Sequence, residues 1–75
     1  MNLYILLKLM DADTPIRVEL GNWVVYEGRK DDFTDSETYE RYRIKAIYYS
    51  FKDEVIVIEI ELYLVPSIQN HLNTL

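Results

Sequence analysis

A strict apolar–polar alternation in residues 16–20, followed by a short turn and a second largely apolar run in residues 23–27, constrains the fold more than any other feature of this sequence. An alternation with a period of two is typical of a strand that buries one of its faces. Gly21 and Asn22 separate the two runs, and a glycine at the first central position suits a two-residue type II′ turn. We therefore predict an antiparallel hairpin formed by residues 16–20 and 23–27.

The two-residue turn also predicts which residues of this hairpin lie opposite each other. Leu20 is expected opposite Trp23, and Val18 opposite Val25. The predicted core side consists of Ile16, Val18, Leu20, Trp23 and Val25. The predicted outer side carries Arg17, Glu19, Val24 and Tyr26.

A second hairpin is predicted from residues 43–50 and 54–64, which are rich in Ile, Val and Tyr. A three-residue loop, 51–53, would place Lys45 opposite Glu59 and Arg43 opposite Glu61. A slip by one residue would mix charged and aliphatic side chains on both faces, so this register is preferred. It places Ile44, Ala46 and Tyr48 on one face with Ile56, Ile58 and Ile60, and it leaves Ile47, Tyr49, Val55 and Val57 on the other.

The ends of the chain and the segment between the hairpins carry helical signals. Residues 2–10 are expected to form a helix with Asn2 as its N-cap, because their apolar positions recur at spacings of three and four. These positions are Leu3, Leu6, Leu7 and Met10. Thr34 and Glu37 fit a capping box, which predicts a short helix over residues 35–42.

Together these elements predict an α+β fold, in which the N-terminal helix packs on a four-stranded antiparallel sheet of two hairpins. The short helix lies between the hairpins. Residues 1–64 are expected to form a single domain, since 75 residues allow no more than one. Residues 65–75 form a C-terminal tail that either docks as a short helix or frays.

The residue types argue against catalysis, which needs reactive groups gathered in a pocket. The chain has no cysteine, and its single histidine, His71, lies in the tail. Asp11 and Asp13 resemble part of a metal motif, but a calcium loop needs further ligands at fixed spacing. We interpret them as turn residues. We expect no enzymatic activity, no cofactor and no metal.

An acidic segment is the first candidate binding surface. The net charge of −5 disfavours direct contact with nucleic acid or an anionic membrane. A cluster of acids could instead imitate nucleic-acid phosphates and occupy a basic groove of a protein partner. The alternative is a solvated loop at a helix start. The predicted patch consists of Asp31, Asp32, Asp35, Glu37 and Glu40, with Tyr39 and Tyr42 as anchors.

The outer face of the predicted sheet is the second candidate, because one helix covers only one face of four strands. Tyrosine is enriched at interfaces, and seven tyrosines are many for this length. This face would bind a partner or form a homodimer, unless the 35–42 helix and the tail cover it. The predicted residues are Val24, Tyr26, Ile47, Tyr49, Val55 and Val57. Strand edges are a third candidate, and no edge is singled out.

The sequence also resembles a pattern seen in small uncharacterised proteins of phages and mobile elements of gut Firmicutes. Residues 6–14 (LLKLMDADT), 16–18 (IRV) and 25–28 (VYEG) carry the resemblance, which covers roughly residues 3–61. In that pattern a leucine-rich helix leads through Met-Asp-x-Asp-Thr to a hairpin ending in Tyr-Glu-Gly. The resemblance implies no catalytic residues.

A small, acidic, cysteine-free protein of a mobile element is similar in type to anti-CRISPR proteins. This similarity implies an inhibitor that occludes the basic nucleic-acid-binding surface of a host defence effector, such as a Cas effector. We also expect a cytoplasmic protein of the host bacterial cell, since the N-terminus has no signal-peptide pattern and no apolar run spans a membrane. A homo-oligomeric assembly protein that buries its second sheet face is the alternative.

Overall fold

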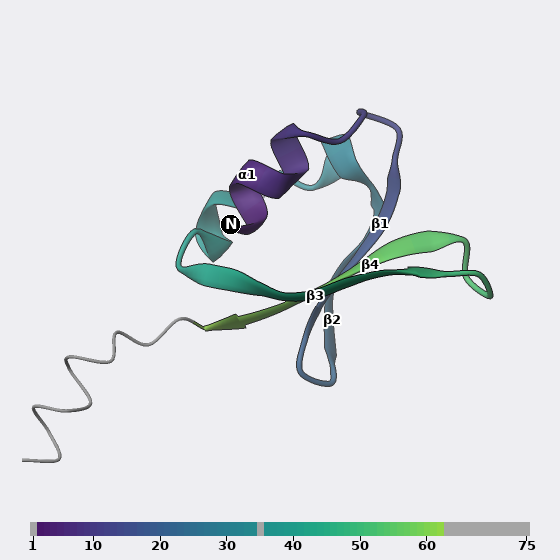
Figure 1. The fold of residues 1–75 in the computed structure, drawn as a ribbon. Helices are drawn as coiled ribbons and strands as arrows, with labels where there is room; N and C mark the ends of the chain where they lie inside the picture. The colour runs from purple at the N-terminus through teal and green to yellow at the C-terminus, as the bar shows by residue number, and fades with distance from the viewer. Residues whose placement is uncertain (1, 35, 63–75) are drawn as a thin grey trace, which may run out of the picture.

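Figure 1 shows the computed structural model, which describes residues 2–34 and 36–62, with the backbone alone for Ser36 and Glu37. In these residues the chain forms one short α-helix, two 3-10 turns and four strands. The helical elements are α1 (Leu3–Lys8), η1 (Lys30–Asp32) and η2 (Ser36–Tyr39). The strands are β1 (Pro15–Leu20), β2 (Trp23–Arg29), β3 (Tyr42–Ser50) and β4 (Val55–Leu62). The predicted α+β class is confirmed, and the tail 65–75 lies outside the described residues.

The four strands form one mixed sheet in the order β2-β1-β4-β3. Both predicted hairpins are present, but β1 and β4 run parallel to each other, so the prediction of a fully antiparallel sheet is wrong. The hairpins join through β1 and β4, which carry most of the buried apolar strand residues. Placing these two strands at the centre buries them best, and their chain directions then make the central pair parallel.

Helix α1 and both 3-10 turns lie on one side of the sheet, which we call the covered face (Figure 1). Asn2 caps α1 as predicted, because its side-chain oxygen accepts a hydrogen bond from the Ile5 amide at 2.9 Å. The helix is shorter than predicted. It ends at Lys8, where the Leu9 and Met10 amides bond to Leu6 and Leu7 carbonyls three residues back.

The core lies between α1 and the central strands. Its fully buried strand residues are Ile16, Val18, Ile58 and Ile60, and α1 contributes Leu3 and Leu7. Phe33, from the segment between the hairpins, completes this cluster and is only 8% exposed. Sequence patterns did not place Phe33 in the core, because it stands alone in a polar segment.

A bulge at Val25 changes the register of the first hairpin. Leu20 lies opposite Trp23 as predicted, and Gly21 has the positive φ of 61° that the predicted turn needs. The register shifts between Glu19 and Val18, so that Val18 lies opposite Tyr26 and not opposite Val25. An unpaired residue moves every following side chain to the other face. Tyr26 therefore points to the covered face, against the prediction.

A bulge at Lys45 has the same effect in the second hairpin. Arg43 lies opposite Glu61 as predicted, with an ion pair at 2.7 Å, but Glu59 lies opposite Ala46 and not opposite Lys45. The loop has four residues, 51–54, and it closes with Glu54 at a positive φ of 56°. The longer loop starts β4 one residue later, and the bulge compensates for that shift.

The bulge at Lys45 exchanges the predicted faces of β3. Ile47 and Tyr49 share the covered face with Ile58 and Ile56. Ala46 and Tyr48 lie on the opposite face, which we call the open face, and their predicted grouping with the isoleucines of β4 is wrong.

The predicted helix over residues 35–42 is also wrong in its length and type. The described part is a single 3-10 turn, η2, and β3 already begins at Tyr42. Tyr39 lies between Phe33 and Tyr42, with ring centroids 6.0 and 5.4 Å away. The capping box depends on Asp35 and on the Glu37 side chain, which lie outside the described residues.

Candidate functional site

The six residues predicted to form one binding face of the sheet are divided between two faces. Val24, Val55 and Val57 lie on the open face. Tyr26, Ile47 and Tyr49 lie on the covered face, because of the two bulges. The predicted surface therefore does not exist as a single patch, although each half can be considered by itself.

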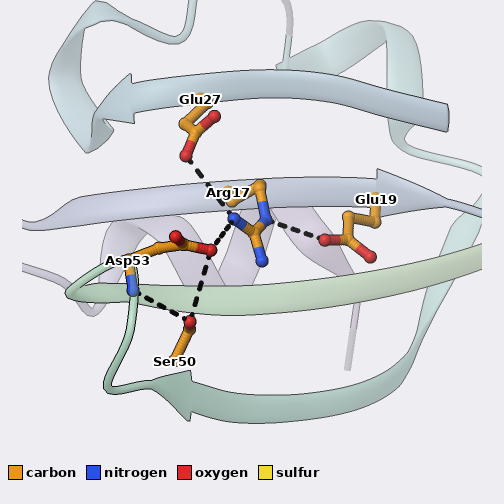
Figure 2. Close-up of polar contacts among 5 residues, drawn as sticks. All are labelled: Arg17, Glu19, Glu27, Ser50 and Asp53. Atoms are coloured by element: carbon orange, nitrogen blue, oxygen red, sulfur yellow. Dashed lines mark hydrogen bonds and ion pairs between the residues drawn. The ribbon is translucent and has the colours of Figure 1, made fainter.

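Arg17 dominates the centre of the open face, where it is surrounded by carboxylates from three different parts of the chain (Figure 2). Its guanidinium contacts Asp53 at 2.7 Å, Glu19 at 2.8 Å and Glu27 at 3.6 Å. Asp53 comes from the β3–β4 loop, and Ser50 at the end of β3 also donates a hydrogen bond to it at 3.4 Å. The network therefore ties this loop to β1 across β4.

These contacts favour the charged form of Arg17, which lies beside buried apolar residues of β4. The hydrogen bonds to Asp53 and Glu19 raise the pKa of Arg17 above its ordinary value, and the bond to Arg17 holds the pKa of Asp53 below its own. Val57 lies between Arg17 and Tyr48 on the neighbouring strands and is 0% exposed. Val55 is buried as well, so these two predicted contact residues do not offer a free surface.

The acidic segment lies beside the loop that contains Asp11 and Asp13, which the sequence predicts to be turn residues. The Lys30 and Asp31 amides donate hydrogen bonds to Thr14 and Ala12 carbonyls at 2.8 and 3.1 Å, so η1 and the 11–14 loop lie side by side. We call the four aspartates of these two neighbouring segments the acidic corner, which consists of Asp11, Asp13, Asp31 and Asp32.

Two basic side chains partly neutralise the acidic corner. Arg29 contacts Asp13 at 2.5 Å and Asp32 at 3.8 Å, and Lys30 contacts Asp31 at 3.2 Å. The bond to Asp13 raises the pKa of Arg29. Of the five acidic residues predicted as a patch, the structure brings Asp31 and Asp32 together. Glu40 is exposed elsewhere, and Asp35 and the Glu37 side chain lie outside the described residues.

The two predicted tyrosine anchors are structural. Tyr39 and Tyr42 belong to a row of rings that continues through Phe33 to Tyr26, whose ring stacks on Phe33 at 4.7 Å. All four rings pack against the core. Burial raises the pKa of Tyr26, and Asp32 adds to this shift. Tyr39 and Tyr42 are therefore partly buried against the core, and their role as partner anchors stays a prediction.

The covered face is left partly exposed at the loop end of β3. Helix α1 packs near the start of β3, where Asn2 pairs with Arg43, and it leaves the other end uncovered (Figure 1). Ile47 is 49% exposed, Tyr49 48% and Phe51 86%. The Phe51 ring packs edge-on against Tyr49 at 4.9 Å. We call Ile47, Tyr49 and Phe51 the hairpin patch.

Sequence reasoning found two residues of the hairpin patch and missed the third. Phe51 was assigned to the loop and given no role. A signal was available, because a phenylalanine in a polar hairpin loop leaves a large apolar ring in water unless something covers it.

A small hollow is present among the described residues, and no metal-ligand cluster is found among them. A shallow hollow of about 120 Å³ lies between α1 and η1, and this volume is below the range of about 300–1,000 Å³ that is usual for ligand sites. No group of three or more histidine or acidic side chains in residues 2–34 and 36–62 could hold a metal ion. Within the same residues no helix is long and apolar enough to cross a membrane.

Comparison with protein-family models, with curated proteins and with solved structures finds no match for this chain. The resemblance to phage and mobile-element proteins therefore stays a prediction.

Proposed function

We propose that this chain is a non-enzymatic protein-interaction module and that the hairpin patch is its contact surface. The observation that carries this proposal is the exposure of three large apolar side chains, Ile47, Tyr49 and Phe51, side by side at one end of the sheet. Contiguous exposed apolar surface is typical of binding sites, and aromatic residues contribute most of the affinity at many interfaces.

The position of the patch also suits binding. It lies on a strand and on a short loop that the Arg17–Asp53 contact ties to the sheet, so little ordering is needed when a partner docks. The open face is less suited, because its centre is filled by ion pairs that a partner would have to desolvate.

An inhibitor of a host defence effector is the second candidate, as the resemblance to anti-CRISPR proteins implies. The gathering of Asp11, Asp13, Asp31 and Asp32 favours it, since two loops distant in sequence combine their charge there. Arg29 and Lys30 pair with three of these four acids, and the chain as a whole carries −5. Such a surface would attract a basic nucleic-acid-binding groove.

The test compares variants of each surface in capture experiments from a bacterial lysate that contains CRISPR effectors. The double variant Tyr49→Ser, Phe51→Ser removes the hairpin patch, and Asp31→Lys, Asp32→Lys reverses the acidic corner. Trp23→Ser is the matched control, because Trp23 is an aromatic residue that is 64% exposed at the opposite edge of the sheet.

The hairpin proposal predicts that capture is lost in the patch variant, persists at high salt and is unchanged in the Trp23 control. Capture of an effector that is lost in the acidic variant and at high salt would favour the inhibitor instead. Equal capture by all four proteins would refute both.

A further inference from the structure

We propose that β3 pairs edge to edge with β3 of a second copy of this chain, antiparallel and about a two-fold axis at Tyr48. This inference rests on the proposed function, because it names a partner for the hairpin patch. Strand β3 ends the sheet order β2-β1-β4-β3, so its outer side has no partner strand among the described residues. An edge strand offers backbone amides and carbonyls that another strand can bind.

Only one part of this edge is available. Asn2 pairs with Arg43 and occupies the start of the outer edge. The bulge at Lys45 distorts the next position, and bulges and lysines are common means of blocking an edge. From Ala46 to Ser50 the strand is regular, and its pairing with β4 is continuous. The free segment is therefore residues 46–50.

The opposite edge of the sheet is less suitable. Strand β2 carries its bulge at Val25, in the middle of the strand, so neither half offers more than a few regular residues. A contact of β3 with β2 of a second copy would also be heterologous and would propagate into fibres, whereas a two-fold β3 pair closes on itself. The structure thus singles out the edge of β3.

The sequence of the free segment is compatible with pairing to itself. Residues 46–50 (AIYYS) contain no charge, so antiparallel pairing places no like charges opposite each other. An axis at Tyr48 uses all five regular residues, and it sets Ile47 opposite Tyr49 of the second copy. Shifting the axis to residue 47 or 49 would draw the bulge or the loop into the pairing.

This arrangement also brings two residues of the hairpin patch into the contact. Paired residues point to the same face, so Ile47 and Tyr49 of both copies meet on the covered face. The two-fold axis is perpendicular to the sheet, and both α1 helices then lie on the same side. On the open face Tyr48 meets Tyr48 of the second copy. Exposed aromatic surface on both faces of one edge is explained by a single contact.

Engineered cysteines test the register, since the chain has none of its own. Opposite residues of an antiparallel pair have Cβ atoms about 4.5–5.5 Å apart, close enough for a disulfide after small adjustments. Under mild oxidation, Tyr48→Cys is expected to form a covalent dimer. Ala46→Cys and Ser50→Cys are matched controls on the same face. Each alone should form no disulfide-linked dimer, and their mixture should form the disulfide-linked mixed dimer.

The unmodified protein is then tested by sedimentation equilibrium up to ~1 mM, because an interface this small implies weak association. We expect a reversible dimer, and Tyr48→Lys should abolish it by placing two charges opposite each other while leaving the hairpin patch intact. A monomer at every concentration, together with no disulfide in the Tyr48→Cys variant, would overturn the dimer. If capture of another protein still required Tyr49 and Phe51, the proposed function would survive that result.

Discussion

Replacing Phe33 tests whether the segment between the hairpins is part of the core. The side chain is buried, with an exposure of only 8%, and it stacks on Tyr26. Truncation of a buried phenylalanine to alanine costs about 3–5 kcal/mol. A 75-residue domain has about 4–11 kcal/mol of stability in total. We therefore expect Phe33→Ala to remove much of that stability and Phe33→Leu to cost about 1–2 kcal/mol.

The matched control is Phe51→Ala, the same substitution at a position that is 86% exposed. It should change stability by less than about 0.5 kcal/mol. Urea denaturation followed by circular dichroism measures both, and with a slope of about 1 kcal/mol per molar the two midpoints should differ by several molar. Equal midpoints would refute the placement of Phe33 in the core. Residues 29–42 would then form a solvated segment, as their polar sequence suggests.

Three further perturbations test local features of the fold. Asn2→Ala should cost about 1 kcal/mol by removing the cap on the Ile5 amide, and Asn2→Asp should not; thermal melts measure the difference. Gly28→Ala should lower the free energy of unfolding by roughly 1–3 kcal/mol, because a φ of 153° disfavours a side chain and the new Cβ would lie 2.7 Å from the Tyr26 hydroxyl. Gly21→Ala, at a φ of 61° with nothing within 4 Å, should lower it by only about 1 kcal/mol in the same urea assay. Arg17 lowers the pKa of Asp53 below its ordinary value of 3.8, so in acid the unfolded chain binds more protons than the folded one. The stability that this pair contributes is present above the unfolded pKa and is lost as the pH falls through the folded pKa. Urea midpoints measured below pH 4 should therefore fall less with pH in Arg17→Gln than in the unmodified protein.

Local patterns predicted the elements well and their assembly poorly. Both hairpins, the Asn2 cap and the Leu20–Trp23 pair could be read from neighbouring residues, because caps and tight turns depend on a few residues. The parallel contact of β1 with β4 could not be read in this way. The apolar richness of β4 was a signal that it would take a central position, next to another buried strand.

The bulges at Val25 and Lys45 account for the errors in the candidate sites. One extra residue moves every side chain beyond it to the other face, so Tyr26, Ile47 and Tyr49 were assigned to the wrong side. A bulge can compensate for a change in loop length. The four-residue loop that ends at Glu54 shifts β4 by one residue, and the bulge at Lys45 restores the register. The contact of the 11–14 loop with η1 was also missed, because backbone hydrogen bonds between distant segments leave no local pattern in the sequence.

The central claim is that the loop end of β3 is the surface through which this protein associates with a second copy of itself. Amide chemical shifts of the labelled protein, recorded from ~1 mM to ~50 µM, test this claim residue by residue. The account predicts concentration-dependent shifts confined to residues 46–51 and their neighbours, with the acidic corner unchanged. Shifts at Asp11, Asp13, Asp31 and Asp32, or spectra that do not change with concentration, would contradict it.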